Sequence, residues 1–296
     1  MDEKDVRKKL KDAKRIVIKI GSSSLTHPDT GAINFSKMEK LVRSLCDLKN
    51  QGKDVALVSS GAIAVGRRAL NMKTKPDTVC VMQACASIGQ ARLMTAYQRL
   101  FAEYGQTIGQ ILMTKYTVTN PSSRENAVNT FEELFRMDII PVVNENDTIS
   151  TYEIHFGDND SLSALVSAIT GADLLILLSD IDGLYTDDPR RNEDAIFISF
   201  VSKIGEDLER MAKEDTGSNV GTGGMKAKIN AAKIATSSGT DMVIANGEDL
   251  ENIERIIKGE KTGTLFEGKK DEKFRIEDYI EETMDGRIEN TKRKFS

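Results

Sequence analysis

Short apolar runs alternate along the chain with amphipathic segments of helical period, and this alternation is the strongest constraint on the fold. The apolar runs end in small or polar residues and predict strands at 16–20, 54–60, 107–114, 139–147, 174–180 and 242–246. The segments between them repeat apolar positions at helical spacing, which predicts helices at 36–52, 62–70, 86–104, 124–136, 161–170 and 225–238. Runs that are apolar throughout, such as LLILL at 174–178, are typical of parallel strands covered on both faces. The sequence therefore predicts an α/β fold, a three-layer α/β/α sandwich with a mostly parallel open sheet.

Local signals predict some of the element ends. In the helix at 36–52, Ser36 followed by Glu39 fits a capping box, and Gly52 fits a helix stop. A further apolar run at 197–201 predicts a short edge strand. After residue 266 the composition becomes charged and loses its apolar period, which predicts a tail over 267–296 that holds one short helix at most.

Composition excludes several classes of function. The net charge of −5 argues against nucleic acid as a partner, but an anionic small molecule needs only a few local lysines. Three cysteines without a CxxC pair predict neither a disulfide framework nor a zinc site, and we expect reduced, mostly buried thiols in a cytoplasmic protein. The charged N-terminus lacks the apolar core of a signal peptide, and no apolar run approaches the ~18 residues of a membrane span.

The predicted strands end in residues suited to binding. Ligands of open parallel sheets bind beyond the carboxyl ends of the strands. Small or polar residues occupy these ends at 21–24, 59–62, 144–147 and 179–180. We therefore expect the functional site along this edge of the sheet.

Two lysine-containing segments suggest a phosphate site. Lys19 lies in an apolar strand just before Gly21, where backbone N–H groups and serine hydroxyls could surround an anion. The segment GTGGMKAK at 221–228 combines close backbone approach with the start of a helix and with Lys226 and Lys228. The alternatives are an edge-strand lysine that reaches solvent and a flexible surface loop.

Several familiar motifs are missing. Neither lysine segment has the GxxxxGK[ST] spacing of a P-loop, and no GxGxxG follows the first strand. His27 and His155 are the only histidines, which disfavours a Ser-His-Asp hydrolase and a histidine-ligated metal. His155 is interpreted as structural or close to substrate.

Two loops rich in Asn and Asp follow strands of the predicted sheet, NEND at 144–147 and GDND at 157–160. Turn formation and helix capping are one interpretation, with Asp160 or Ser161 as the cap. Binding the ammonium group of an amino acid, or orienting lysines, is the other. Carboxylates beside phosphates need cations nearby, which Lys19 and Lys228 could supply.

Six segments in order resemble the amino acid kinase family over roughly residues 15–266, and most closely its members that phosphorylate glutamate. They are IKIGSSSLT, VSSGAIAVGRRAL, VVNENDTIS, FGDNDSLSA, LLSDIDGLYTDDPR and GTGGMKAK. The resemblance implies that residues 1–266 form one kinase domain that transfers the γ-phosphoryl group of ATP to the side-chain carboxylate of L-glutamate. The product would be L-glutamyl 5-phosphate, at the first step of proline biosynthesis.

The resemblance also implies a role for individual residues. Lys19 and Lys228 would neutralise the transferring phosphoryl group, and Asp160 would hold both lysines. Glutamate would be bound by Ser60, Asp147 and Asn159, with Asn144 and Asp158 close by. Contacts to ATP would come from Lys19, Gly21, Ser179, Asp180, Thr222, Gly223, Gly224, Met225, Lys226 and Lys228.

Cofactors and partners follow from the same resemblance. Mg²⁺ would be held mainly by the phosphates of ATP, without a dedicated protein site. A homo-oligomer, inhibition by proline at or over the glutamate site, and a glutamyl phosphate reductase as pathway partner are also implied. Many relatives carry a C-terminal PUA domain, which we do not expect in the residues after 266, and Ser179 stands where threonine is frequent in the family.

Two alternatives stay open at this point. One is a sibling kinase of the same fold that acts on acetylglutamate, aspartate, carbamate or uridylate, which the NEND and GDND loops disfavour. The other is a non-catalytic amino acid sensor, which the presence of both Lys19 and Lys228 disfavours.

Overall fold

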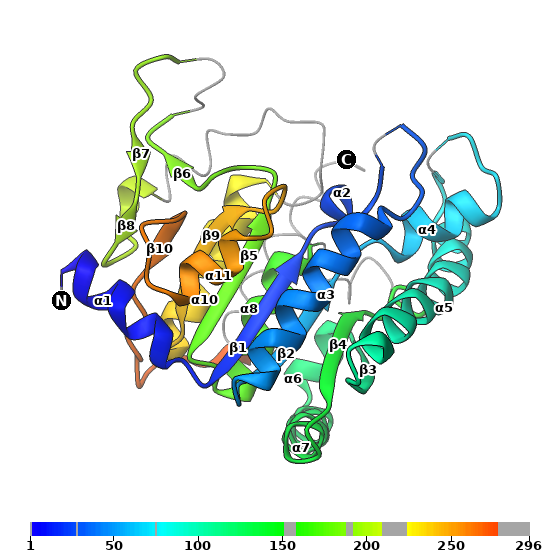
Figure 1. Cartoon of the computed structure of the whole chain (residues 1–296), viewed down its shortest axis with the longest axis horizontal. Helices are drawn as coiled ribbons and strands as arrows, with labels where there is room; N and C mark the ends of the chain where they lie inside the picture. The colour runs from blue at the N-terminus through cyan, green and yellow to red at the C-terminus, as the bar shows by residue number, and fades with distance from the viewer. Residues whose placement is uncertain are drawn as a thin grey trace, which may run out of the picture.

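The computed structural model describes residues 2–27, 29–74, 76–150, 158–187, 192–208 and 224–277. Its centre is an eight-stranded sheet in the order β3-β4-β2-β1-β5-β9-β10-β8 (Figure 1). The strands are β1 Arg15–Ile20, β2 Asp54–Ser59, β3 Ile108–Met113, β4 Ile140–Glu145, β5 Leu174–Ser179, β8 Phe200–Val201, β9 Asp241–Asn246 and β10 Thr264–Phe266. Neighbouring strands run parallel except for the antiparallel pair β9 and β10. The predicted mostly parallel sheet is confirmed.

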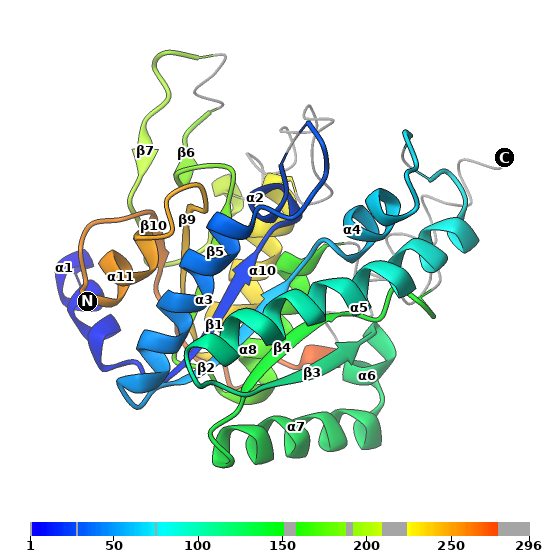
Figure 2. The ribbon, with the colours of Figure 1, turned by 45° about the vertical axis from the view of Figure 1, so that its right-hand side comes forward.

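Helices cover both faces of this sheet, as the turned view in Figure 2 shows. Their bounds are α1 Glu3–Lys9, α2 Ser22–Leu25, α3 Phe35–Asn50, α4 Ala62–Ala69, α5 Val79–Glu103, α6 Lys115–Thr119, α7 Pro121–Arg136, α8 Asn159–Thr170, α10 Met225–Ser238 and α11 Asn252–Ile257. A short 3₁₀ turn, Leu10–Asp12, follows α1. Within the described ranges, no helix has both the length and the apolar character needed to cross a membrane.

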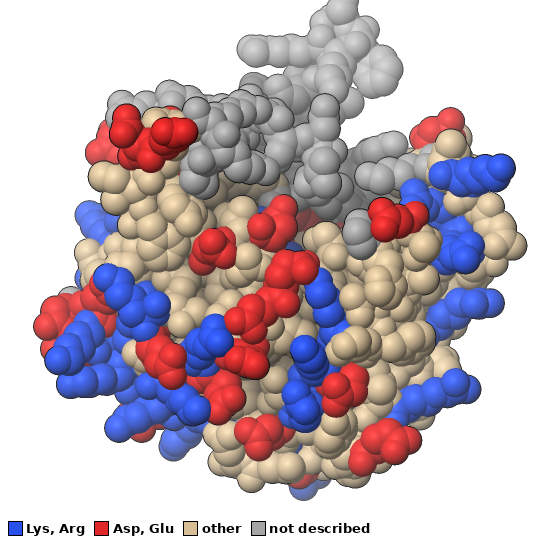
Figure 3. All heavy atoms as spheres, turned by 45° about the horizontal axis from the view of Figure 1, so that its top comes forward, with Lys and Arg blue, Asp and Glu red and all other residues tan. Residues whose placement is uncertain are grey.

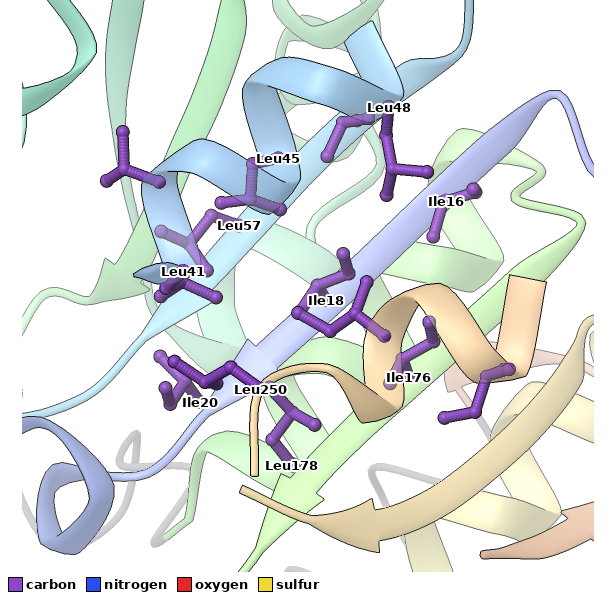
Figure 4. Close-up of a cluster of buried hydrophobic side chains, with 14 of the residues drawn as sticks. Ile16, Ile18, Ile20, Leu41, Leu45, Leu48, Leu57, Ile176, Leu178 and Leu250 are labelled. Carbon is purple, nitrogen blue, oxygen red and sulfur yellow. The ribbon is translucent and has the colours of Figure 1, made fainter. Parts of the chain in front are cut away.

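Two hydrophobic clusters, one on each face, fill the layers of the sandwich. The first joins the sheet to α3, α5 and α11, and Figure 4 shows Leu41, Leu45 and Leu48 of α3 above the isoleucines of β1. The second joins the opposite face to α7, α8 and α10. The predicted three-layer α/β/α sandwich is therefore confirmed.

Alternation along β1 decides where its lysine points. Ile16, Ile18 and Ile20 belong to the first cluster and Val17 to the second. Successive side chains of a strand point to opposite faces, so Lys19 shares the face of Val17. Lys19 is thereby directed toward the layer of α8 and α10.

The predicted strand at 197–201 is divided between two sheets. Its first half is β7, Phe197–Ile198, which pairs with β6, Leu184–Tyr185, in a small antiparallel hairpin. Its second half is β8, at the edge of the main sheet. The rings of Tyr185 and Phe197 pack edge to face across the hairpin, with their centroids 5.2 Å apart. The hairpin projects from the body of the molecule in Figure 1.

Several element ends differ from the sequence prediction. The predicted capping box at Ser36 and Glu39 is wrong, because Asn34 is the N-cap and accepts from the Lys37 backbone N–H at 3.1 Å. α5 begins at Val79 and α7 at Pro121, both earlier than predicted. All three cysteines are free thiols, with Cys46 and Cys85 buried and Cys80 exposed.

The first residues beyond 266 pack against the body of the sandwich. The backbone N–H of Gly268 donates to Asp241 at 2.7 Å, and that of Lys269 donates to the Thr236 carbonyl at 2.9 Å. Glu277 pairs with Arg124 of α7 at 2.5 Å. The boundary at residue 266 stays a prediction, and residues 278–296 of the predicted tail lie outside the described residues.

Helices α4 and α5 are in backbone contact through two glycines. A Cβ atom at Gly66 would lie 1.8 Å from the carbonyl oxygen of Cys85, and one at Gly89 would lie 1.7 Å from the carbonyl oxygen of Ala62. Real atoms cannot approach so closely, so these positions admit only glycine while the two helices keep their spacing. α4 follows directly from the end of β2, which ties this contact to the edge where we expect the site.

We expect Gly66→Ala and Gly89→Ala each to lower the free energy of unfolding by about 1–3 kcal/mol, the usual cost of overpacking. This loss runs against helix propensity, which favours alanine over glycine by about 1 kcal/mol. Gly205→Ala is the control, because a Cβ there meets no atom within 4 Å. Urea unfolding measures all three variants, and equal stabilities would contradict the contact between the backbones.

Candidate active site

A buried carboxylate joins two lysines from distant parts of the chain. Nζ of Lys19 lies 2.5 Å from Oδ1 of Asp160, and Nζ of Lys228 lies 3.2 Å from Oδ2 of the same residue. The exposed fractions are 8% for Lys19, 1% for Asp160 and 5% for Lys228. The three residues that sequence reasoning combined are thus in direct contact.

Each member of this triad is placed by its own element. Lys19 is the next-to-last residue of β1, Asp160 lies in the first turn of α8, and Lys228 lies in the first turn of α10. α10 presents small residues, including Ala231 and Ala232, to the second cluster and packs closely on α8. The carboxylate therefore lies between the end of a strand and the starts of two helices.

Two ammonium groups share the carboxylate of Asp160 in a buried place. The carboxyl group of Asp158 also lies close enough to interact with the charge of Lys19. Burial alone would raise the pKa of Asp160, but attraction to Lys19 and Lys228 outweighs it and holds the pKa below its ordinary value. An aspartate with a lowered pKa that holds two ammonium groups side by side is suited to a site for an anionic ligand.

A cluster of hydrogen-bonded polar side chains lies beside the triad, and we call it the amide cluster: Ser60, Gln90, Asn144 and Asn159. Nδ2 of Asn159 donates to Oγ of Ser60 at 2.7 Å and to Oδ1 of Asn144 at 3.0 Å. Nδ2 of Asn144 donates in turn to Oε1 of Gln90 at 2.9 Å. Asn159 precedes Asp160 in the chain, so the two groups meet at the first turn of α8.

One backbone donor fixes the direction of these bonds. The N–H of Glu145 donates to Oδ1 of Asn144 at 2.9 Å, and a backbone N–H cannot reverse its role. Asn159 must therefore present Nδ2 to that oxygen. Both Nδ2 hydrogens of Asn159 are then used, which leaves its Oδ1 as an acceptor and the Ser60 hydroxyl hydrogen as a donor. An acceptor beside a donor suits the ammonium and carboxylate groups of an amino acid.

The remaining acidic residues of the predicted glutamate site lie close by. Asp158 is the N-cap of α8 and accepts from the N–H of Ser161 at 2.7 Å, so the cap is neither Asp160 nor Ser161. Burial and the neighbouring Asp160 raise the pKa of Asp158 above its ordinary value. Asp147 is half-buried in the loop after β4, in the turn that Asn146 forms with Ser150.

The ends of β1, β5 and β9 converge on the other side of Lys19. A Cβ at Gly21 would lie 3.7 Å from Nζ of Lys19, so glycine leaves space beside the ammonium. Ser179 is buried, its hydroxyl donates to the exposed Asp180 at 3.0 Å, and its carbonyl accepts from Gly247 at 2.7 Å. Ser179 also pairs in register with Asn246 across β5 and β9.

The start of α10 separates the two lysines of the GTGGMKAK segment. Lys226 is exposed and Met225 half-buried, whereas Lys228 is buried on Asp160. A Cβ at Gly224, the N-cap of α10, would meet no atom within 4 Å, so the protein itself does not require glycine there. Thr222 and Gly223, and also His155, lie outside the described residues.

Sequence reasoning missed Gln90, Glu145, Asn246 and Gly247. Asn246 and Gly247 end a predicted strand, so the rule used for the other strand ends applies to them as well. Glu145 belongs to the NEND segment, although its contribution is a backbone N–H. Gln90 lies in the middle of a helix, where no sequence signal distinguishes it.

The visible face on the strand-end side carries mixed charge. Figure 3 shows basic and acidic side chains interspersed over this face. Among the described residues, no group of three or more His, Cys, Asp and Glu side chains is placed to hold a metal ion.

Comparison with known proteins identifies the protein family to which this site belongs. The model of the amino acid kinase family matches residues 14–246. The chain therefore belongs to the amino acid kinase family. The solved UMP kinase of Ureaplasma parvum aligns with a TM-score of 0.59 over 86% of this chain and 98% of its own, at 17% identity. The isopentenyl phosphate kinase of T. acidophilum aligns with a TM-score of 0.57 over 85% and 99%, at 16% identity, and both support the fold alone.

Relatives of higher identity narrow the group. A glutamate 5-kinase of Clostridium perfringens is 49% identical over 271 residues, which cover 90% of this chain and 100% of the relative. That of Clostridium acetobutylicum is 51% identical over 88% of this chain and 96% of its own. That of Carboxydothermus hydrogenoformans is 50% identical over 91% of this chain and 72% of its own. Within the family, the chain groups with the glutamate 5-kinases.

Asp160→Asn should lower the free energy of unfolding at pH 7 by about 3–5 kcal/mol, the usual cost of removing one partner of a buried ion pair. The folded-state pKa of Asp160 is lowered. Its stabilisation is therefore fully present above the unfolded-state value of about 3.9 and is lost as the pH falls through the folded value. Urea unfolding should show a constant deficit above about pH 4 that shrinks at more acid pH.

Asp158→Asn is the matched control, two residues earlier in the same turn. Asparagine caps helices as well as aspartate does. The pKa of Asp158 is raised, so its charged form costs stability at neutral pH, and this variant should be as stable as the unmutated chain or more so. Equal losses in the two variants would contradict the assigned difference.

Proposed function

We propose that the chain transfers the γ-phosphoryl group of ATP to the side-chain carboxylate of L-glutamate and forms L-glutamyl 5-phosphate, the first intermediate of proline biosynthesis. The observation that carries the proposal is the contact of Lys19 and Lys228 with the two oxygens of Asp160. Asn159, the neighbour of Asp160, belongs to the amide cluster, whose free donor and acceptor suit an amino acid. The phosphoryl site and the acceptor site thus share one helical turn.

The reaction needs little acid–base chemistry from the protein. The glutamate side chain is already an anionic nucleophile at neutral pH, so no strong general base is required. Its oxygen forms the bond to phosphorus while the bond from phosphorus to the β–γ bridging oxygen breaks and ADP leaves. Catalysis then depends on positioning and on positive charge at the equatorial oxygens.

Lys19 and Lys228 supply that charge from opposite sides of one carboxylate. Asp160 is almost fully buried and stays ionised, so it holds both ammonium groups at fixed positions. Asp160 is a positioning residue in this scheme, and the two lysines are the catalytic residues.

The amide cluster orients glutamate. The hydroxyl of Ser60 donates to a carboxylate oxygen, and Oδ1 of Asn159 accepts from the ammonium group. Asp147 adds a carboxylate for the same ammonium, while Asn144 and Asp158 support the site through Asn159 and the cap of α8.

ATP lies along the ends of β1, β5 and β9 in the proposal. Gly21 leaves space beside Lys19, and Ser179, Asp180 and the start of α10 border the nucleotide. Mg²⁺ prefers oxygen ligands and retains several waters. In this proposal the phosphates of ATP would supply most of its other ligands, and the ion would offset part of their charge.

The same proposal covers partners that the resemblance implies. The chain acts in the cytoplasm as a homo-oligomer, and a glutamyl phosphate reductase takes up its labile acyl phosphate. The predicted charged tail over 267–296 remains a prediction.

The test of the function is ADP release with a panel of acceptors at fixed ATP and Mg²⁺. Glutamate should support turnover, and acetylglutamate, aspartate, carbamate and UMP should support little. Preferred turnover of another acceptor would assign the chain to a sibling activity. Binding of glutamate without turnover would favour an amino acid sensor.

Lys228→Ala separates catalysis from binding. We expect turnover to fall by about 10²–10³-fold, the usual loss when one donor to transition-state charge is removed. Glutamate affinity, measured by calorimetric titration, should change little. Lys226→Ala is the matched control, because Lys226 is exposed and lies two residues before Lys228. Turnover of this variant should fall only a few-fold. Equal effects of the two changes would contradict the role of Lys228.

Proline should raise the apparent KM for glutamate without lowering the limiting rate, because the proposal places it at or over the glutamate site. Initial rates over a grid of proline and glutamate concentrations measure this. A fall in limiting rate with unchanged KM would contradict an overlapping site.

A further inference from the structure

Gln90 lies beneath the proposed glutamate site although it belongs to none of the segments that form it. The residue sits in α5 and is 8% exposed. Its neighbour Gly89 is in contact with the first turn of α4, which begins just after Ser60. The close approach of the two helices therefore places a glutamine side chain under the strand ends of the site.

The two polar atoms of the Gln90 side chain are in opposite situations. Oε1 accepts from Nδ2 of Asn144 at 2.9 Å. Nε2 is buried and has no hydrogen-bond partner among the described residues. A buried amide nitrogen without a partner costs about 1–3 kcal/mol, so the contacts of Gln90 with the described residues do not by themselves account for glutamine at this position.

The bond from Asn144 to Gln90 completes the support of one amide plane. Oδ1 of Asn144 is held by the N–H of Glu145, and Nδ2 is held by Gln90. With both ends held, Asn144 offers its oxygen to Asn159 in one orientation. That orientation decides which atoms of Asn159 and Ser60 are left for a ligand.

We propose that Gln90 is a positioning residue for the amino acid acceptor. Its carbonyl oxygen locks Asn144, and through Asn144 it fixes Asn159 with the acceptor oxygen toward the ammonium group and Ser60 with its hydroxyl toward a carboxylate. The inference rests on the proposed function for the identity of the acceptor. It adds a residue of α5 to a site otherwise built from strand ends and from α8.

Gln90→Met tests the proposal, because methionine keeps the volume and removes the acceptor oxygen. KM for glutamate should rise about tenfold, the value of one lost hydrogen bond of about 1.4 kcal/mol. KM for ATP and kcat at saturating glutamate should change less than about twofold, because the triad and the nucleotide region are untouched. The melting temperature should change little, because the loss at Asn144 is offset by removal of the unsatisfied Nε2.

Two further variants separate positioning from packing. Gln90→Glu keeps an acceptor oxygen at the same reach and should retain most of the glutamate affinity. Gln98→Met, an exposed glutamine of the same helix, should leave every parameter unchanged. In a chain that already carries Asn144→Ala, Gln90→Met should not raise KM for glutamate further, because the side chain through which Gln90 acts on Asn159 has been removed.

The outcomes distinguish this inference from the proposed function. Unchanged KM for glutamate in Gln90→Met, equal rises in KM for ATP and glutamate, or additive effects with Asn144→Ala would overturn the role of Gln90 while the function stands. If the unmutated chain prefers another acceptor, KM for that acceptor replaces KM for glutamate in the same comparison. A chain that neither binds nor phosphorylates any acceptor of the panel would overturn both.

Discussion

The ion triad at Asp160 is the interaction on which the rest of the site depends. Three elements reach it, and each does so for a simple geometric reason: β1 by side-chain alternation, and α8 and α10 by beginning at the same edge of the sheet. Burying three charges is costly, and it is tolerated here because each carboxylate oxygen has its own ammonium partner. The fold thus gathers two ammonium groups at one point of a chain whose net charge is −5.

This arrangement explains why a phosphotransferase needs no conspicuous catalytic residue. The two histidines and three cysteines of the chain play no part in the proposed chemistry. In the proposed reaction the acceptor is already ionised, and the protein contributes geometry and the positive charge of its two lysines. Asp158 and Asp160 illustrate the division of labour, because two carboxylates of one turn have pKa values shifted in opposite directions. One caps a helix and the other anchors cations.

Much of the fold could be predicted from local pattern, whereas the triad at the centre of the site was predicted from the resemblance to the amino acid kinase family. The apolar strands and their polar ends located the edge of the sheet, and the lysine of IVIKI pointed to phosphate. Features that depend on contacts between distant segments could not be predicted. Arg7 illustrates this, because its guanidinium is buried and donates to carbonyl oxygens near residues 199 and 260–263. β10 is only three residues long, too short for a clear strand pattern in the sequence. Gln90 resembles any other glutamine in a helix, and only its tertiary contact with Asn144 distinguishes it.

The glycine contact between α4 and α5 has a mechanical consequence. With backbone against backbone at Gly66 and Gly89, neither helix can slide past the other. Ser60 lies just before α4 and Gln90 lies within α5, so the separation of the two helices sets the distance between these two residues of the proposed acceptor site. The two glycines thereby help to define the dimensions of that site.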